Sequence, residues 1–401
     1  MQISGAHLTY CTNIHPGESW AQVFENVRTH VLAVKARTAP EQPFGVGLRL
    51  SAAAARTLRE PATLAEFQAF LAQHQLYVFT INGFPYGPFH AEPVKAAVYR
   101  PDWRDAERAR YTGDLAWLLA ELLPEGLAGS ISTVPGGFKA ELLGREQEAR
   151  VAAQLIQQAL ELHRLRERTG RDIALALEPE PCCMLETTEE TLAFFEGELL
   201  SHASRSWLAR QAQVSFDEAE RIVRRHLGVC LDTCHAAIEF ERADETLDRL
   251  ASAGINIHKI QLSTGLRLAE PSPESLRALG AYDEPVYLHQ VVAHTRAGQL
   301  LRFTDLPQAL ADREARAAAE WRVHFHVPLY SDNLGAFGNT QAFLARVLER
   351  QRQAPVSLQL EVETYTWDVL PPEQRTGSVV ASISRELAWV KERLASPSRS
   401  T

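Results

Sequence analysis

Apolar segments of strand length alternate with amphipathic segments of helix length along nearly the whole chain. Eight segments are apolar runs or alternate between apolar and polar positions, at residues 6–13, 44–50, 76–82, 129–135, 173–178, 229–232, 257–263 and 356–363. Helical spacing of apolar positions occurs at about 18–36, 63–73, 105–122, 141–168 and 376–394, and twice more between the fifth and sixth strands. Such alternation is typical of an α/β protein with a parallel sheet, and eight strands predict a (β/α)8 TIM barrel. A doubly wound open sheet is the alternative, but no Gly-rich phosphate turn follows the first strand.

Local signals refine this outline. Residues 63–66 and 215–218 each have the spacing of a capping box, which predicts that a helix begins there. We expect residues 1–395 to form one barrel domain, because the strand–helix alternation accounts for nearly all of them. Residues 396–401 are expected to be a disordered tail.

Residues 266–330 are too many for a plain connection between a strand and a helix. Residues 286–294 and 300–304 predict a β-hairpin, followed by a helix near 307–320 and a short strand at 322–328. Either this segment is an insertion, or residues 324–327 are themselves a barrel strand. As an insertion it is expected to form a lid, since connections leaving the C-terminal ends of barrel strands lie on the active-site side. An oligomer contact is the alternative role.

The composition is ordinary for a soluble globular protein, with 45% hydrophobic and 23% charged residues. A formal charge of −9 and a pI near 5.9 disfavour a nucleic-acid-binding protein, which usually has a basic face. The first residues lack the features of a signal peptide, and no apolar run approaches the length of a membrane span, so we expect a cytoplasmic protein. The five cysteines have no disulfide or zinc-site spacing, which predicts small buried hydrophobic side chains in a reducing compartment.

Acidic residues occur at the ends of three predicted strands. A barrel turns its apolar side chains outward toward the helices, so the polar positions of each strand face the interior. Glu178, Asp232 and Glu361 then lie at the C-terminal ends of the fifth, sixth and eighth strands, where barrel active sites are built. Buried carboxylates are costly unless they are paired or bind a metal. We therefore expect a site for a divalent metal (Zn, Mn or Mg), and the alternative is a salt-bridge network around Arg49 and Lys259.

Histidines extend the candidate site. The turn after the sixth strand brings His235 back beside Asp232, as a metal site requires. Alternatively, Asp232 only caps the next helix and His235 is merely close. His324 and His326 are separated by one residue and point the same way. We favour His326 as a ligand, with His324 or His289 orienting a substrate.

Four of these features together resemble the xylose-isomerase-like sugar epimerases: a Glu ending the fifth strand, an Asp-x-x-His turn, a His-x-His strand and a final Glu. The resemblance implies a (β/α)8 barrel that binds a divalent metal through four residues, here Glu178, Asp232, His326 and Glu361. The seventh strand carries Gln261 where the metal histidine of the epimerases would lie. Either His326 replaces that histidine from the insertion, or the site has lost its metal.

The predicted site residues fall into two groups. The metal ligands are Glu178, Asp232, His235, His326 and Glu361. The substrate-binding residues are Arg49, Glu180, Lys259, Gln261, His289, His324 and Glu363.

The chain as a whole is similar to the EboE family of metabolite-traffic proteins, which belong to ebo-type gene clusters. Five segments carry this resemblance, at residues 7–18, 231–235, 287–290, 324–328 and 361–371. It implies a bacterial barrel protein whose cluster supports the production or export of a secondary-metabolite precursor. A homo-oligomer, or a complex with other proteins of the cluster, is compatible with this role.

Three functions are compatible with these features. The first is a metal-dependent isomerase or epimerase of a small polar metabolite, in which Glu178 and Glu361 move a proton between carbons and the metal stabilises an enediolate. The second is a metabolite-binding or carrier protein that keeps the pocket without catalysis. The third and weaker option is a metal-dependent phosphodiester hydrolase, which would need a basic surface for nucleic acid. The fold alone leaves this choice open.

Overall fold

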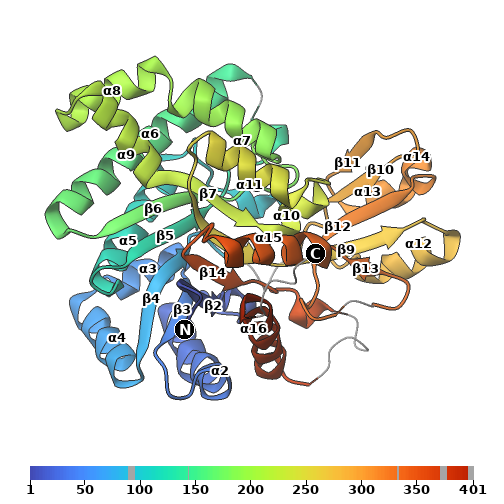
Figure 1. Cartoon of the computed structure of the whole chain (residues 1–401), viewed down its shortest axis with the longest axis horizontal. Coiled ribbons are helices and arrows are strands. Elements are labelled where there is room, and N and C mark those ends of the chain that lie inside the picture. Colours follow the sequence, from blue (N-terminus) through green and yellow to red (C-terminus); the bar gives the residue numbers. More distant parts are fainter. Residues whose placement is uncertain (89–94, 143, 332–333, 371–376, 396–401) are drawn as a thin grey trace.

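Eight parallel strands form the barrel, as the alternation predicts (Figure 1). The computed structural model describes residues 1–88, 95–142, 144–331, 334–370 and 377–395. Neighbouring barrel strands follow the order of the chain: β2 (Ala6–Tyr10), β3 (Phe44–Arg49), β4 (Leu76–Asn82), β5 (Ala128–Thr133), β6 (Asp172–Leu177), β7 (Leu227–Asp232), β8 (Ile257–Leu262) and β14 (Gln359–Val362). The fold class and the eight predicted strands are therefore confirmed, and the open-sheet alternative is wrong.

The barrel closes between its first two strands. β14 pairs with both β8 and β2, and β1 (Gln2–Ile3) pairs antiparallel with β2. Cys11 forms a parallel bridge with Gly47, and the Thr9 hydroxyl donates a hydrogen bond of 2.6 Å to the carbonyl of Gly45. A Cβ atom at Gly47 would collide with the carboxylate of Glu361 inside the barrel. Glycine at this position therefore lets β3 approach the interior acid closely.

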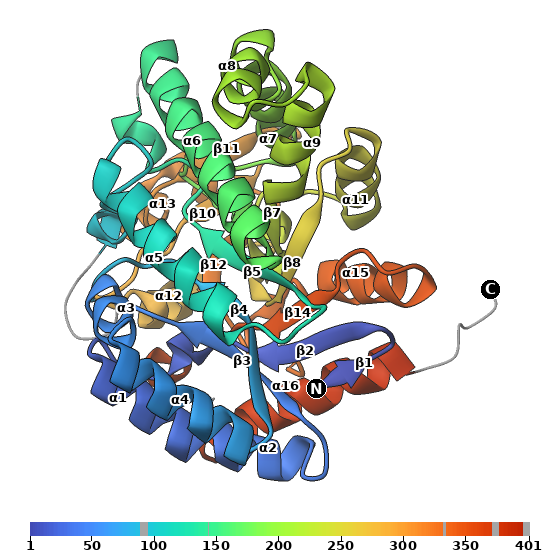
Figure 2. The ribbon, with the colours of Figure 1, turned by 90° about the vertical axis from the view of Figure 1, so that its left-hand side faces the viewer.

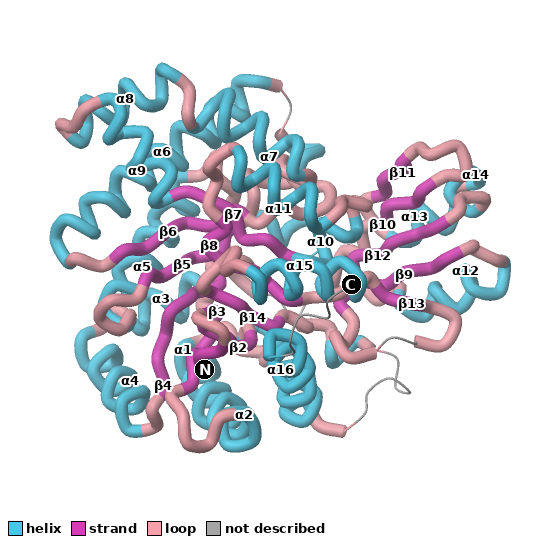
Figure 3. Tube along the Cα trace, in the orientation of Figure 1, coloured by secondary structure: helices cyan, strands magenta, loops and turns pink. Residues whose placement is uncertain are grey.

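Helices surround the strands and bury their apolar faces against them (Figure 3). The outer helices are α1 (Trp20–Asn26), α2 (Leu32–Thr38), α3 (Ala52–Leu58), α4 (Pro61–Gln73), α5 (Ala106–Leu122), α6 (Arg145–Thr169), α7 (Thr188–Phe194), α8 (His202–Ala212), α9 (Phe216–His226), α10 (Thr233–Ile238), α11 (Ala243–Ser252), α15 (Gln341–Gln353) and α16 (Val379–Ala395). The predicted start at residues 215–218 is confirmed, because the Ser215 hydroxyl accepts a hydrogen bond from the Glu218 amide. The other predicted start is wrong: α4 begins two residues earlier, at Pro61, with Glu60 at its N-cap. Proline favours this first helical position because its missing N–H needs no partner there.

The segment after β8 forms a separate antiparallel sheet, at the right of Figure 1. Its strands lie in the order β11 (Leu300–Phe303), β10 (Val291–His294), β12 (Glu320–His326), β9 (Gly265–Ala269) and β13 (Gly338–Asn339). It also contains α12 (Pro273–Leu279), α13 (Leu306–Ala311) and α14 (Arg313–Arg316), so the single helix expected near 307–320 is two short ones. The predicted hairpin is present as β10 and β11. Residues 324–327 belong to the sheet of this insertion or directly follow it, and not to the barrel, which settles the alternative left open by the sequence.

The inside of the barrel is polar, as the period-two pattern predicts. Lys259 and Glu361 form an ion pair of 2.5 Å, and both side chains are completely buried. Ser130 donates a hydrogen bond to Gln359 Oε1 (2.5 Å), and the Cys230 thiol donates one to Gln261 Oε1 (3.1 Å). The salt-bridge alternative is therefore realised for one acid, Glu361.

All five cysteines are free thiols, and four of them are buried. The predicted disordered tail, 396–401, lies outside the described residues. Within the part of the chain that the structure describes, no helix is both long and apolar enough to cross a lipid bilayer.

Candidate functional site

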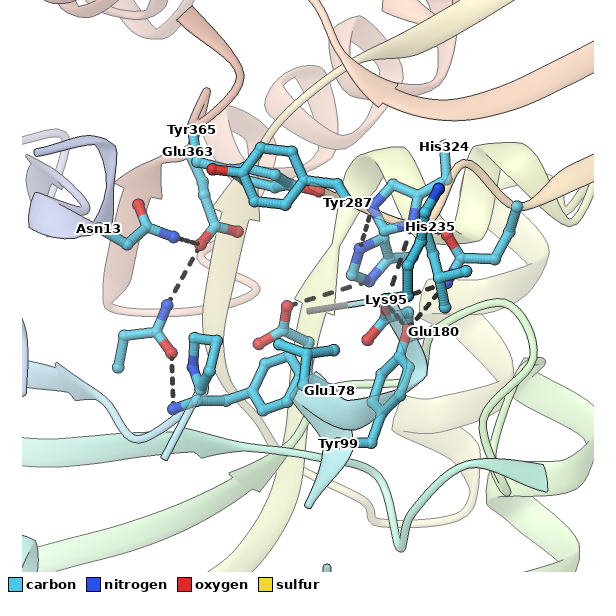
Figure 4. Close-up of a pocket in the computed structure, with 16 residues that line it drawn as sticks. Asn13, Lys95, Tyr99, Glu178, Glu180, His235, Tyr287, His324, Glu363 and Tyr365 are labelled. Atoms are coloured by element: carbon cyan, nitrogen blue, oxygen red, sulfur yellow. Dashed lines mark hydrogen bonds and ion pairs between the residues drawn. The ribbon is translucent and has the colours of Figure 1, made fainter. Parts of the chain in front are cut away.

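A cavity of about 550 Å³ lies where the strands of the barrel end (Figure 4). Its barrel side includes Glu178 after β6, His235 in α10 and Glu363 after β14. The insertion supplies further lining residues: Tyr287, Leu288, Gln290 and His324. The predicted placement of the insertion at the active-site end therefore agrees with the lining of this cavity. Its movement as a lid stays a prediction.

Asp232 has one oxygen in hydrogen bonds and one without a partner. Asp232 Oδ1 accepts hydrogen bonds from the Cys234 amide (2.7 Å), the His235 amide (3.0 Å) and the Ser263 hydroxyl (2.6 Å). This oxygen caps α10, because a strand-end aspartate can satisfy the first amides of the next helix. Asp232 Oδ2 is buried and has no hydrogen-bond partner among the described residues. The helix-cap and metal-ligand interpretations of the Asp-x-x-His turn are therefore compatible, since each uses a different oxygen.

Two further buried atoms lack partners close to Asp232. They are Glu178 Oε2, from the end of β6, and His326 Nε2, from the end of β12. Within the described residues, ligand atoms of Glu178, Asp232 and Glu363 all lie within 4.8 Å of one another, and so do those of Asp232, His235 and His326. Buried polar atoms are normally hydrogen-bonded, so several unsatisfied ones at one point indicate a ligand.

The orientation of the flanking groups fits a metal centre. His326 Nδ1 lies 2.8 Å from the backbone carbonyl of Glu363 and donates a hydrogen bond to it. In a neutral ring the other nitrogen, Nε2, then has its lone pair available to bind a metal. Glu363 Oε1 accepts hydrogen bonds from Asn13 Nδ2 (2.6 Å) and Asn82 Nδ2 (3.2 Å). One imidazole nitrogen and three carboxylates form a donor set that suits Zn or Mn, and the oxygen donors also suit Mg. The residues present therefore fit a divalent cation.

Burial shifts the protonation of these groups in different directions. It raises the pKa of Glu178 and Glu363 well above the ordinary value, and the neighbouring carboxylates add to the effect. Burial alone would raise the pKa of Asp232 too, but the imidazole of His235 and the hydrogen bond from Ser263 lower it. Burial lowers the pKa of His326 to about 4, so its imidazole is neutral at pH 7 and able to ligate.

His235 and His324 meet beside these groups with their ring planes at 80° to one another. Their Nε2 atoms lie 3.0 Å apart. His235 Nδ1 lies 3.1 Å from the carbonyl of Pro179, and His324 Nδ1 lies 2.8 Å from Gln290 Oε1, so both Nδ1 atoms must donate. Each Nε2 of a neutral ring would then present a lone pair to the other. This arrangement suits a pair that shares one hydrogen-bonded proton or faces a cation.

Glu180 extends this arrangement. Its Oε1 accepts hydrogen bonds from the Tyr99 hydroxyl (2.6 Å) and from Gln290 Nε2 (3.3 Å), and it lies 3.8 Å from His324 Nδ1. Figure 4 shows Glu180, Tyr99 and the two histidines on the same side of the cavity, with Glu363 and Asn13 on the other. Glu180 and His324 therefore line the cavity, as predicted for substrate-binding residues.

Glu361 does not join the candidate ligands. Its carboxylate lies deeper in the barrel, in the ion pair with Lys259, and Glu363 takes the position expected for it. Both residues face inward because Glu363, directly after β14, lies two positions beyond Glu361 and continues the alternation of the strand. We therefore replace Glu361 by Glu363 in the ligand set and assign Glu361 and Lys259 to the polar core.

Three other predicted substrate-binding residues lie outside the cavity lining. Arg49 donates to the carbonyls of Gly17 (3.0 Å) and Gly87 (2.5 Å) and so ties two loops together. Gln261 lies inside the barrel and is paired in register with Asp232. His289 lies 3.3 Å from Glu284 inside the insertion. Burial alone would lower the pKa of His289, but Asp305 and Glu284 raise it.

Several lining residues were not predicted. They are Asn13, Asn82, Tyr99, Gln290 and Tyr365. Asn82 ends β4 and Asn13 follows β2, so the strand-end criterion that selected the acids would have found these two amides if applied to asparagine. Tyr99 and Gln290 come from a loop and from the insertion, where no periodicity indicates which side chains face the cavity.

No protein-family model and no curated protein matches the chain. Among solved structures, a D-tagatose 3-epimerase-like protein is 12% identical, with a TM-score of 0.49 and 97% of each chain covered. The probable 3-DHS dehydratase AsbF of Bacillus anthracis is 13% identical, with a TM-score of 0.47, and 95% of this chain and 97% of that chain are covered. The IOLI protein with a bound zinc atom is 14% identical, with a TM-score of 0.45 and 97% of each chain covered.

Further similar structures contain xylose isomerase domains. At these identities and TM-scores, the likeness assigns neither a family nor an activity to this chain. None of these comparisons supports the narrower resemblance to the EboE family.

Proposed function

We propose that the protein is a metal-dependent isomerase or epimerase of a small polyhydroxylated metabolite. The observation that carries this proposal is the set of buried atoms without hydrogen-bond partners: Glu178 Oε2, Asp232 Oδ2 and His326 Nε2. Structural acids of a core are normally paired, as Glu361 is with Lys259. Unpaired acids that meet beside a neutral imidazole are instead arranged for a cation.

Glu178, Asp232, His326 and Glu363 would hold the ion. A divalent cation bound there supplies positive charge that polarises the carbonyl and hydroxyl oxygens of a substrate. Asn13 and Asn82 hold Glu363 through Oε1, so its Oε2 is the oxygen open to the cavity contents. Glu178 and Glu363 approach the cavity from different strands, β6 and β14, and both are candidates to move a proton at a substrate carbon.

The remaining lining residues support binding of a small molecule. The aromatic rings of Phe84, Tyr287 and Tyr365 provide apolar surface on which the C–H face of a polyol can lie. Gln290, His324 and Glu180 provide hydrogen-bonding groups in the same cavity. The resemblance to the EboE family extends the proposal to a secondary-metabolite precursor, and the five free thiols agree with a cytoplasmic location.

Metal binding is tested with a matched pair of variants on one strand. Glu363→Gln should lower the affinity for Zn or Mn by more than about 100-fold, since it removes a direct ligand, whereas outer partners are worth 10–100-fold. Glu361→Gln, two residues away, should retain the affinity. Asp232→Asn should also lose the metal but keep the fold, because Oδ1 still caps α10. Equal metal content by elemental analysis in Asp232→Asn and the wild type would refute the ligand assignment.

Catalysis is tested by exchange of carbon-bound hydrogen in D₂O, followed by ¹H NMR over a panel of ketoses, aldoses and keto-cyclitols. Metal-loaded protein should catalyse exchange at a carbon next to the carbonyl, and Asp232→Asn should not. Saturable binding of a panel member without any exchange would favour the carrier function instead.

A further inference from the structure

A second cavity lies at the other end of the barrel, where the strands begin. It is larger and more open to solvent than the cavity at the C-terminal end. The first residues of β5, β6 and β8, the residues just before β14, and the last turns of α9 line it. Figure 2 shows the molecule from this end, with α9 drawn above β5 and β8. The lining includes two alanines near strand starts, Ala128 and Ala174, whose small side chains leave room there.

The rim of this cavity holds an apolar residue that the fold leaves uncovered. The alternation along residues 356–363 predicts that Leu358 packs outward under a helix, like Leu360 and Val362. Leu358 is instead 55% exposed, and it is the one large apolar side chain of the described residues that is exposed. Its carbonyl accepts a hydrogen bond from the His7 amide (2.8 Å), which holds the backbone in place. Half-buried Val356 stands beside it in the lining, so the two form a fixed apolar surface.

The opposite wall is basic, although the chain as a whole carries a charge of −9. Arg221, Arg224 and Arg225 come from the end of α9, and Asp172 is the one acid of the lining. Arg224 is held rigidly: Nη1 donates to the carbonyls of Ala253 (2.8 Å) and Gly254 (2.9 Å). Its Nε donates to Glu220 (2.9 Å), so this residue is already largely satisfied.

Arg225 differs from its neighbours. Arg221 pairs with Glu218 at 2.8 Å, whereas Arg225 is half-buried and forms no ion pair with any described residue. A guanidinium presents a planar fork that matches a carboxylate or a phosphate. Among the described residues no acid lies within ion-pair distance of Arg225, although it adds to the hydrogen bond from Arg221 in lowering the pKa of Glu218. A half-buried arginine facing a cavity with an apolar rim therefore matches a ligand with an anionic group and an apolar body.

We propose that this cavity binds a small amphiphilic anion, namely a carboxylate or phosphate group on an apolar body. The anionic group pairs with Arg225, and the apolar body lies on Leu358 and Val356. This site is separate from the proposed metal centre, which lies at the other end of the barrel. Its occupancy is independent of the reaction proposed above.

The test uses n-hexyl phosphate as the probe for the full-length protein, with binding measured by isothermal titration calorimetry. Hexanoate, which carries a carboxylate in place of the phosphate, should also bind. Hexanol and inorganic phosphate each lack one of the two features and should bind at least about tenfold more weakly, the loss expected for a hydrogen bond to a charged group. Hexanol binding as tightly as hexyl phosphate, or no saturation by hexyl phosphate at millimolar concentration, would overturn the proposal.

Variants locate the site. Arg225→Ala and Leu358→Ser should each weaken hexyl phosphate binding about tenfold or more, because each removes one half of the recognition. Arg210→Ala removes an exposed arginine of α8 outside the cavity and should leave binding unchanged. Asp232→Asn should bind the probe like the wild type, so failure of the metal centre and failure of this site are distinguishable. Equal weakening in Arg210→Ala and Arg225→Ala would show a diffuse charge effect and refute the assignment.

Discussion

Replacing Lys259 by methionine tests whether Glu361 belongs to the core or to the metal centre. Both side chains of the pair are completely buried, and Nζ lies 2.5 Å from Oε2. At an effective dielectric constant of about 20, Coulomb's law gives an attraction of about 7 kcal/mol at this distance, most of which offsets the cost of removing two ions from water. Burial alone would lower the pKa of Lys259, but the attraction of Glu361 outweighs it and raises that pKa.

Removing one partner leaves the other ion buried alone. We expect Lys259→Met to lower the free energy of unfolding by about 3–5 kcal/mol, the range for a broken buried pair. Glu361→Gln should cost a similar amount, because a neutral amide no longer offsets the charge of the completely buried ammonium group. The double variant should be no less stable than either single variant, since it leaves no unpaired charge. The magnitude of the coupling energy should therefore be at least about 3 kcal/mol, well above the roughly 0.5 kcal/mol seen for independent sites.

Urea unfolding of the four proteins at pH 7 measures this cycle. Metal affinity is measured on the same preparations by equilibrium dialysis with Zn. Additive effects of the two substitutions would show that the pair is not coupled. A loss of metal in Glu361→Gln as large as in Glu363→Gln would show that Glu361 is a ligand after all, and the assignment made from the geometry would be wrong.

Two further predictions concern buried acids away from the metal centre. Burial raises the pKa of Glu386 from 4.5 to about 7. The folded state therefore keeps a proton that the unfolded state releases between these pH values, so Glu386 should contribute a loss of stability of about 3 kcal/mol as the pH rises from 4.5 to 7. Glu386→Gln should remove this contribution and leave that of the other buried acids, so its loss of stability between pH 5 and pH 8 in urea unfolding should be smaller than that of the wild type by about 2–3 kcal/mol. Equal losses in the two proteins would contradict the prediction. Arg302 of β11 donates to Glu239 after α10 (2.7 and 2.8 Å) and anchors the insertion. Arg302→Ala should cost about 1–3 kcal/mol and speed hydrogen exchange in β10 and β11 while metal content stays unchanged; unchanged exchange would show that the anchor lies elsewhere.

The sequence alone determined the barrel, because period-two and helical alternation are local properties of the chain. It also located Glu178 and Asp232, since each directly ends an apolar strand and strand ends gather at one face of a barrel. The sequence also identified the insertion, because residues 266–330 are more than a connection between a strand and a helix needs.

The tertiary structure distinguishes residues that the local periodicity places on the same face of an element. Glu361 and Glu363 point the same way along β14, and only the buried Lys259 on β8 determines that the first is neutralised and the second faces the cavity. His235 and His324 are 89 residues apart in the chain and meet only because the insertion folds against the barrel end. Leu358 follows the apolar pattern and yet remains exposed, since burial depends on whether a neighbouring element covers the position. Alternation gives the direction of a side chain, whereas its depth and its partners depend on elements distant in the sequence.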